Sequence, residues 1–391
     1  MKALSLFSGA GGMDIGIKKA GFEVLACLEL DEHACSTLRA NVAFNKEKTK
    51  ILEGDIKAVN PDNLLKDLKV KKGELDLLFG GPPCQSFSQI GKQLHLKDER
   101  GLLLFEMVRF AKAIEPKVIL VEQVKGLLTA RGDDDRRGEV FETFTNDLKK
   151  LGYSIKWQVI NASYYGVAQA RERVFVVAFK GENNPFNFPH PTHGADIDQL
   201  IPTLPMKTVG DVLKGLGKPE KKNKDGQKRT DNHIDATPDG DRKRIVGVPE
   251  GGHLSAQKHL PPEQIGKLSK KDTTKYLRLS RTRPANTLRC GEIFFHPLED
   301  RYLTPREYMR IHGYPDSYVL MGPVRGRSGS VRNLDQHRQI ANSVPPPVAE
   351  VLACEIKRTL SCQKSLKSSD TKPKTKAPKQ PNTENNADVP L

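Results

Sequence analysis

The first 180 residues alternate short apolar runs with stretches of helical periodicity. Helical patterns lie between several of the runs, including one that begins at Asp31 and one over 101–114. The runs themselves, each typical of a strand, are 3–7, 23–30, 50–56, 75–79, 118–124, 155–160 and 173–179. This alternation predicts an α/β fold, in which helices cover a mostly parallel sheet. Ligands of such sheets bind at the carboxyl ends of the strands.

Composition narrows the class of partner. The net charge of +15 favours a polyanion such as nucleic acid or an anionic surface. The six cysteines include no CxxC pair and are too sparse for a disulfide scaffold, so we expect no zinc site and a reducing cytoplasm. Since no apolar run reaches about 18 residues and no signal peptide is evident, we expect no membrane association.

A glycine-rich loop follows the first predicted strand in "LFSGAGGMDIG". Glycines there let a ligand approach the backbone at a helix N-terminus. A dinucleotide fingerprint would need glycine where Asp14 stands, which argues against a nicotinamide enzyme. Glu29 and Asp55 end the next two strands, where a carboxylate can accept ribose hydroxyls. These features favour a nucleoside of modest charge, such as S-adenosylmethionine, over an ordinary turn with surface acids.

The fourth strand leads into "FGGPPCQSFS". Two prolines fix the backbone just before Cys84, so the segment forms a rigid arm that presents one thiol at the ligand edge. A nucleophile needs such placement, and its thiol must be biased towards thiolate. The alternative, that Cys84 is a small buried hydrophobe, fits its polar neighbours poorly.

Four further polar side chains are predicted near this edge. Glu122 lies near the end of an apolar strand, where a carboxylate is costly unless it is paired or functional. In "QARER", period-two spacing places Gln169, Arg171 and Arg173 on one face of an extended segment. The two arginines could bind a phosphate, orient a carboxylate or bias the thiol.

Seven blocks in this order make the chain resemble the cytosine-5 DNA methyltransferase family of bacterial restriction-modification systems. The resemblance covers about residues 3–185 and 281–357. Its blocks are "LFSGAGG", "GGPPCQSFS", "VEQVKG", "QARER", "RPANT", "RYLTPREYMRIHGYPDSY" and "ANSVPPPVA". It implies a Rossmann-like S-adenosylmethionine-dependent sheet with a smaller, loop-rich target-recognition domain.

The domain division expected from composition and resemblance has five parts. The catalytic and cofactor-binding domain would be 1–184, followed by a target-recognition region over 185–280 and the rest of the small domain over 281–340. Residues 341–362 would return to the catalytic domain, and 363–391 would form a disordered basic tail.

The resemblance also implies roles for individual residues. The implied catalytic residues are the nucleophile Cys84, then Glu122, Arg171 and Arg173. The implied cofactor-binding residues are Phe7, Gly9, Gly11, Gly12, Glu29, Asp55, Pro82, Asn342 and Ser343. The implied substrate-binding residues are Gln85, Ser88, Gln169 and Thr287. No metal is implied.

The implied reaction moves a methyl group from S-adenosyl-L-methionine to carbon 5 of a flipped cytosine, through a Cys84 adduct, in one short sequence of double-stranded DNA. We expect a monomer, and a cognate restriction endonuclease acting on the same site is left open as a partner. We also expect His233, His253 and Lys258 to mark a base-reading surface within 185–280.

Two departures from the family pattern are visible. Gln123 stands where the family has asparagine, which puts in question the bracing of the cysteine loop, and Ala341 replaces a glycine. Two alternatives stay open: a transfer-RNA cytosine-5 methyltransferase with the same catalytic blocks, and a DNA-binding regulator with impaired catalysis.

Overall fold

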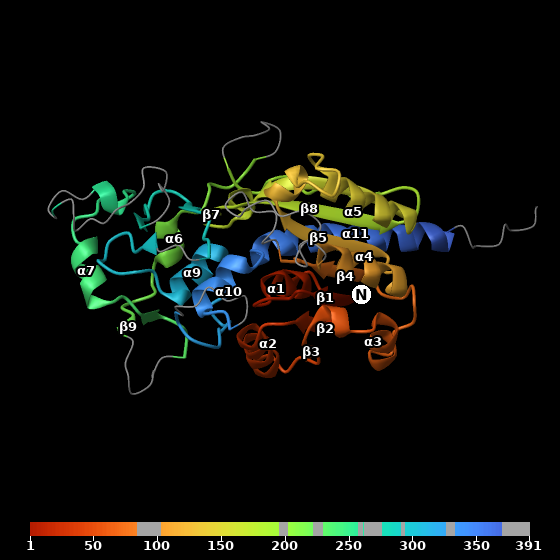
Figure 1. Cartoon of the computed structure of the whole chain (residues 1–391), viewed down its shortest axis with the longest axis horizontal. Helices are drawn as coiled ribbons and strands as arrows, with labels where there is room; N and C mark the ends of the chain where they lie inside the picture. Colours follow the sequence, from red (N-terminus) through yellow and green to blue (C-terminus); the bar gives the residue numbers. More distant parts are fainter. Residues whose placement is uncertain are drawn as a thin grey trace, which may run out of the picture.

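The computed structural model describes residues 1–83, 103–194, 202–221, 230–256, 261, 276–290, 294–325 and 333–369, with side chains as far as residue 363. At its centre lies a seven-stranded sheet of order β3-β2-β1-β4-β5-β8-β6 (Figure 1). The strands are β1 (Lys2–Leu6), β2 (Glu23–Glu29), β3 (Lys50–Glu53), β4 (Leu77–Gly80), β5 (Val118–Val124), β6 (Tyr153–Asn161) and β8 (Glu172–Lys180). Only β8 opposes its neighbours, pairing antiparallel with β5 and β6. The predicted α/β class with a mostly parallel sheet is therefore confirmed.

Helices cover both faces of this sheet (Figure 1). Those of the larger part are α1 (Gly12–Lys19), α2 (Glu32–Phe44), α3 (Pro61–Asp67), α4 (Leu103–Ile114), α5 (Glu139–Lys150) and α11 (Pro346–Ser369). Single 3-10 turns occupy Ile56–Ala58, Lys125–Thr129 and Ala162–Tyr165. The helix expected from Asp31 is α2, whose N-cap is the Asp31 carboxylate, bonded to the Ala34 amide.

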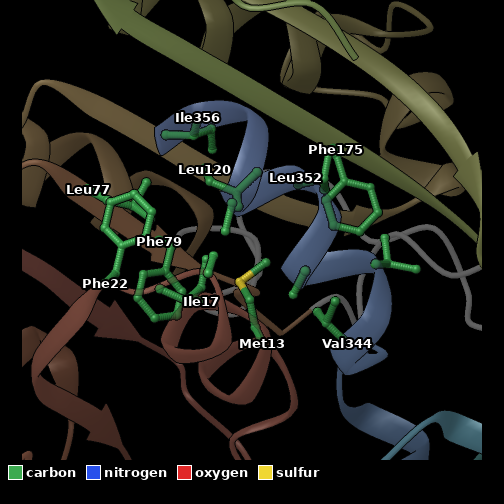
Figure 2. Packing of buried hydrophobic residues seen from close by; sticks show 14 of the residues in the cluster. Met13, Ile17, Phe22, Leu77, Phe79, Leu120, Phe175, Val344, Leu352 and Ile356 are labelled. Atoms are coloured by element: carbon green, nitrogen blue, oxygen red, sulfur yellow. The ribbon is translucent and has the colours of Figure 1, made fainter. Parts of the chain in front are cut away.

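Strand alternation divides the core into two layers. On β4, Leu77 and Phe79 point into one cluster, while Leu78 belongs to the other. The first cluster packs against Ile17 of α1 and Leu352 of α11, as Figure 2 shows. The second packs against the apolar stripes of α4 and α5. Both faces of the central strands are thus buried, which explains their nearly continuous apolar sequence.

The last helix returns to the first one. From the side of α9 and α10, α11 runs back along the sheet beside α1 (Figure 1). The approach is close at Gly16 of α1, where an added Cβ would lie 2.5 Å from both the Glu350 nitrogen and the Pro346 oxygen of α11. Glycine is therefore required there by contact between two backbones.

The smaller part of the molecule has short elements around its own core. They are α6 (Val209–Leu213), α7 (Asp239–Ile245), α9 (Pro305–His312), α10 (Gln336–Asn342), the 3-10 turn Leu254–Ala256, and β7 (Gln169–Ala170), β9 (Glu220–Lys221), β10 (Ile234–Asp235), β11 (Leu277–Arg278), β12 (Ala285–Asn286) and β13 (Phe294–Phe295). Leu288, Phe294 and Met309 are among its buried residues. The boundaries predicted between domains stay predictions.

No helix within the described ranges is both long enough and apolar enough to cross a membrane.

Candidate active site

The loop after β1 has left-handed backbone at three positions. Phe7, Gly9 and Gly11 have φ of 55°, 53° and 74°. Among the residues that the structure describes, no atom lies within 4 Å of a Cβ built on Gly9, so this side of the loop is open. A Cβ on Gly12 would lie 2.3 Å from the Val344 oxygen, because the chain entering α11 packs directly on the loop. The loop therefore combines an open side with a tightly packed one.

The carboxylate of Glu29, at the end of β2, is held by backbone amides of this edge. The Gly9 nitrogen donates to Oε2 at 2.6 Å, and the nitrogens of Leu30 and Asp31 donate to Oε1 at 2.9 Å each. Burial raises the pKa of Glu29, although the three amides oppose that shift. The side chain is thus fixed in orientation at the carboxyl end of its strand.

Asp55 follows β3, the neighbour of β2, and lies exposed at the same edge. Its carboxylate accepts from the Lys57 nitrogen at 2.9 Å, and the preceding Gly54 nitrogen donates to the Glu29 oxygen. Leu30, which directly follows Glu29 at the end of β2, has an exposed side chain.

The chain returns to this edge at the end of α10. The exposed Asn342 accepts from the Cys290 thiol through Oδ1 at 2.8 Å. Ser343 is buried, and its hydroxyl donates to the Ile340 oxygen at 2.8 Å. Ser343 also lies against the glycine loop, since its Cβ would be 3.1 Å from a Cβ on Gly12.

A buried ion pair lies where β5 ends. Arg173 Nε donates to Glu122 Oε1 at 2.9 Å, and Glu122 is 8% exposed. Burial raises the pKa of Glu122, while Arg173 and Arg171 lower it. The pair joins antiparallel β5 and β8, in which Val124 is opposite Arg173. Burial and the two arginines thus act on the pKa of this carboxyl group in opposite directions, and burial has the larger effect.

Arg171 is 2% exposed and donates to two backbone oxygens, those of Leu288 at 3.3 Å and Ser343 at 3.1 Å. Burial and the nearby Arg173 lower the pKa of Arg171 to about 9. Its Nε has no hydrogen-bond partner among the described residues. The burial pattern of 169–173 alternates, as the period-two prediction requires.

Gln169 belongs to β7, where it is opposite Ala285 of β12, and Thr287 directly follows β12. Gln169 is fully buried, and its amide bonds to His312 and to the Leu288 nitrogen. The Thr287 hydroxyl donates to the Ala170 oxygen at 2.7 Å. The structure thus places Gln169 in the interior and Thr287 at the strand edge.

The segment with Cys84, Gln85 and Ser88 lies outside the described residues, which end at Pro83 before it. Gln123 holds the backbone just before this segment, because its Nε2 donates to the Pro82 oxygen at 2.8 Å. Gln123 Oε1 accepts from the Val124 nitrogen at 3.2 Å. The glutamine that departs from the family pattern therefore reaches the loop and braces it two residues before the cysteine.

Two tyrosines that sequence reasoning did not single out support the glycine loop. The Tyr318 hydroxyl donates to the Ala10 oxygen at 2.9 Å, and the Tyr314 hydroxyl would lie 2.8 Å from a Cβ on Gly12. Both lie in "HGYPDSY", the end of the block "RYLTPREYMRIHGYPDSY". The spacing of the aromatic residues there could have indicated them. Asp14 lies buried in α1, and its Oδ1 accepts from the Cys27 thiol.

One sequence prediction is wrong. His233 is 0% exposed, with its ring nitrogens bonded to the Thr304 hydroxyl and the Gly217 oxygen. A ring enclosed in this way cannot contact a DNA base. Lys258 lies outside the described residues. Within the described ranges, no group of three or more His, Cys, Asp or Glu side chains could hold a metal ion.

Known methyltransferases are similar to this chain in sequence. A model of the family described as C-5 cytosine-specific DNA methylase matches residues 1–358. The chain is 34% identical over 358 residues to the type II methyltransferase M.Eco47II of Escherichia coli, covering 88% of this chain and 75% of that protein. It is 31% identical over 361 residues to the type II methyltransferase M.NgoFVII of Neisseria gonorrhoeae, covering 91% and 86%.

Solved structures share the fold. A DNA modification methyltransferase encoded within an E. coli prophage has a TM-score of 0.67 at 22% identity, covering 92% of this chain and 99% of that one. The methyltransferase EhMeth of Entamoeba histolytica has a TM-score of 0.53 at 17% identity, covering 92% and 98%. Because the family model spans 358 residues and both curated relatives exceed 30% identity over most of the chain, this protein belongs to the C-5 cytosine-specific DNA methylase family.

Proposed function

We propose that this enzyme transfers a methyl group from S-adenosyl-L-methionine to carbon 5 of a cytosine flipped out of a specific short duplex sequence, through a covalent adduct with Cys84. The observation that carries the proposal is the buried Glu122–Arg173 pair beside a loop that Gln123 braces just before Cys84. A proton donor and the approach to a thiol thus lie on adjacent strands, β5 and β4.

The residues of the cofactor edge suit a nucleoside with a sulfonium. Gly9 faces open space, and Glu29 presents an oriented carboxylate at the end of β2. Glu29 would accept ribose hydroxyls, and the exposed Asp55 would bond the adenine. Phe7, Gly11, Gly12, Pro82, Asn342 and Ser343 would complete the pocket. When bound, S-adenosyl-L-methionine supplies an electrophilic methyl group.

Carbon 5 of cytosine is a weak nucleophile, and the protein residues must activate it. The Cys84 thiolate forms a bond to carbon 6, and the electrons of the C5–C6 double bond make carbon 5 enamine-like. Glu122 donates its proton or a hydrogen bond to ring nitrogen 3, which stabilises the developing charge. After methyl transfer, a base removes the proton from carbon 5, the double bond forms again, and the C6–sulfur bond breaks.

Arg173 orients Glu122, and Arg171 lies beside the pair with an Nε free of bonds to the described residues. These arginines would support the base and its phosphate. Gln85, Ser88 and Thr287 would contact the substrate or position the recognition region. A flipped base is needed because carbon 6 cannot be reached inside a stacked duplex.

The partner we propose is double-stranded DNA, bound by a monomer in the cytoplasm, with residues 185–280 as the recognition region. The +15 charge suits the phosphate contacts of such binding. The relatives above are named type II methyltransferases, which supports a restriction-modification role beside an endonuclease of the same specificity. The family match favours DNA over transfer RNA, and the Gln123 brace argues against a catalytically impaired regulator.

The test is bisulfite sequencing of DNA from cells that express the chain, beside a Cys84→Ala control. Protected cytosines within one short motif, absent in the control, are the expected result. Purified protein is then assayed with DNA and with transfer RNA as competing acceptors. Methylation of RNA alone, or equal protection with Cys84→Ala, would refute the proposal.

A further inference from the structure

His312, the last residue of α9, lies fully buried between the two parts of the molecule. Its Nδ1 is 2.9 Å from Gln169 Nε2, and its Nε2 is 3.0 Å from the Ser343 oxygen. These partners are 143 residues earlier and 31 residues later in the chain. The imidazole therefore connects β7 with the segment that enters α11.

Backbone groups at the two ends fix the direction of every hydrogen bond. The Leu288 nitrogen can only donate, so the Gln169 amide must be oriented with Oε1 as its acceptor, at 3.0 Å. The Gln169 amide nitrogen must then donate to His312 Nδ1, which has to be unprotonated. At the other end, the Ser343 oxygen can only accept, so His312 Nε2 carries the proton. His312 is thus neutral and held in a single tautomer.

The same two backbone residues hold Arg171. Its Nη1 donates to the Leu288 oxygen and its Nη2 to the Ser343 oxygen. The bonds therefore form a closed ring that runs Leu288, Gln169, His312, Ser343, Arg171 and back to Leu288. Gln169 lies in β7, with Arg171 directly after the strand, and His312 ends α9. Leu288 and Ser343 lie just after β12 and α10, so the ring joins segments that are far apart in sequence.

We propose that His312 is a positioning residue for methyl transfer, which places Arg171 beside the Glu122–Arg173 pair by closing this ring. The role of Gln169 is then to orient His312 rather than to touch the substrate. The inference rests on the function proposed above. Burial and the neighbouring Arg171 hold the pKa of His312 well below its usual range, which agrees with a neutral ring.

Three variants separate positioning from folding. In His312→Gln, one amide can accept from Gln169 and donate to the Ser343 oxygen, so the ring polarity is kept. In His312→Met, both bonds are lost while an apolar side chain fills the space. His337→Met is the control: His337 is partly buried, and its ring nitrogens lie 2.9 Å from two backbone oxygens, those of Val324 and Leu303, but it is not part of the ring.

We expect His312→Met to lower kcat roughly 10- to 100-fold through misplacement of Arg171, with KM for DNA nearly unchanged. His312→Gln should recover most of the rate, and His337→Met should keep the wild-type kcat per folded molecule. Full kcat in His312→Met, or an equal loss in His312→Gln and His312→Met, would overturn the inference.

Nitrogen-15 NMR of the histidine rings gives a readout that does not depend on activity. Wild-type His312 should show the neutral Nε2–H tautomer between about pH 6 and 8. In Gln169→Glu, a carboxylate that only accepts should draw a proton onto Nδ1 and raise the pKa of His312. The Arg171 guanidinium signals should shift in His312→Met and much less in His312→Gln.

An Nδ1–H tautomer in the wild type, ordinary titration of His312, or unmoved Arg171 signals would each refute the positioning role. If the wild-type enzyme transfers no methyl group to cytosine, the proposed function fails instead, and these NMR signals still decide whether His312 places Arg171.

Discussion

The contact between α1 and α11 predicts opposite results for one substitution at two sites. In Gly16→Ala, the new Cβ would meet the Glu350 nitrogen and Pro346 oxygen at 2.5 Å and the Ala349 Cβ at 2.6 Å. Backbone atoms cannot rotate away, so α11 has to move by about 1 Å, and overpacking of this kind costs about 3 kcal/mol. Alanine recovers about 1 kcal/mol through its better helix propensity. The net loss is about 2 kcal/mol.

Gly240 is the matched control, because it is also helical but exposed, and its Cβ would meet no atom of the described residues within 4 Å. Gly240→Ala should stabilise the protein by about 0.5 kcal/mol through propensity alone. Urea unfolding of the three proteins measures both effects from the midpoints, provided that the slopes agree. If Gly16→Ala were as stable as the wild type, the packing of α11 against α1 described above would be wrong.

Three further substitutions test the site. Glu122→Gln should lower kcat about 100-fold or more, because the proposed proton donor is lost. The wild-type rate should fall as the pH rises through the raised pKa of Glu122, because the proton is then lost; a pH–rate profile of Glu122→Gln that kept this limb would contradict the assignment. Gln123→Ala should cost about 1–3 kcal/mol of stability by leaving the Pro82 oxygen unsatisfied, with Cys84 adduct formation on a fluorinated cytosine duplex slowed; unchanged trapping would contradict the brace. Glu29→Ala should weaken S-adenosylmethionine binding in calorimetry while leaving DNA binding intact, and equal affinity for the cofactor would place the ribose elsewhere.

The strands could be predicted because their signal is local. The run 118–124 coincides with β5, and 173–179 lies within β8, since apolar β-branched residues favour buried strands wherever they occur. The antiparallel direction of β8 could not be read in this way, because a buried strand has the same composition in either direction. The Glu122–Arg173 pair depends on that direction and on its register.

The acids at the strand ends were also predictable, because parallel strands bring their carboxyl ends to one edge. The ring through Gln169 and His312 was not, since its members come from four distant segments that meet only after folding. The same holds for His233, which looked like a polar loop residue and is enclosed by Thr304 and Gly217. Local sequence indicates a polar side chain, but only packing decides whether it faces solvent.

The position of α11 has a consequence for synthesis on the ribosome. The apolar face of β1 and α1 is made first, yet the helix that covers it begins at Pro346. At a translation rate of about 5–20 residues per second, that face stays uncovered for roughly 20–70 s before α11 is made. Nascent or truncated chains therefore lack one wall of the glycine loop, which Val344 supplies. We therefore expect a chain to methylate DNA only after its α11 has been translated.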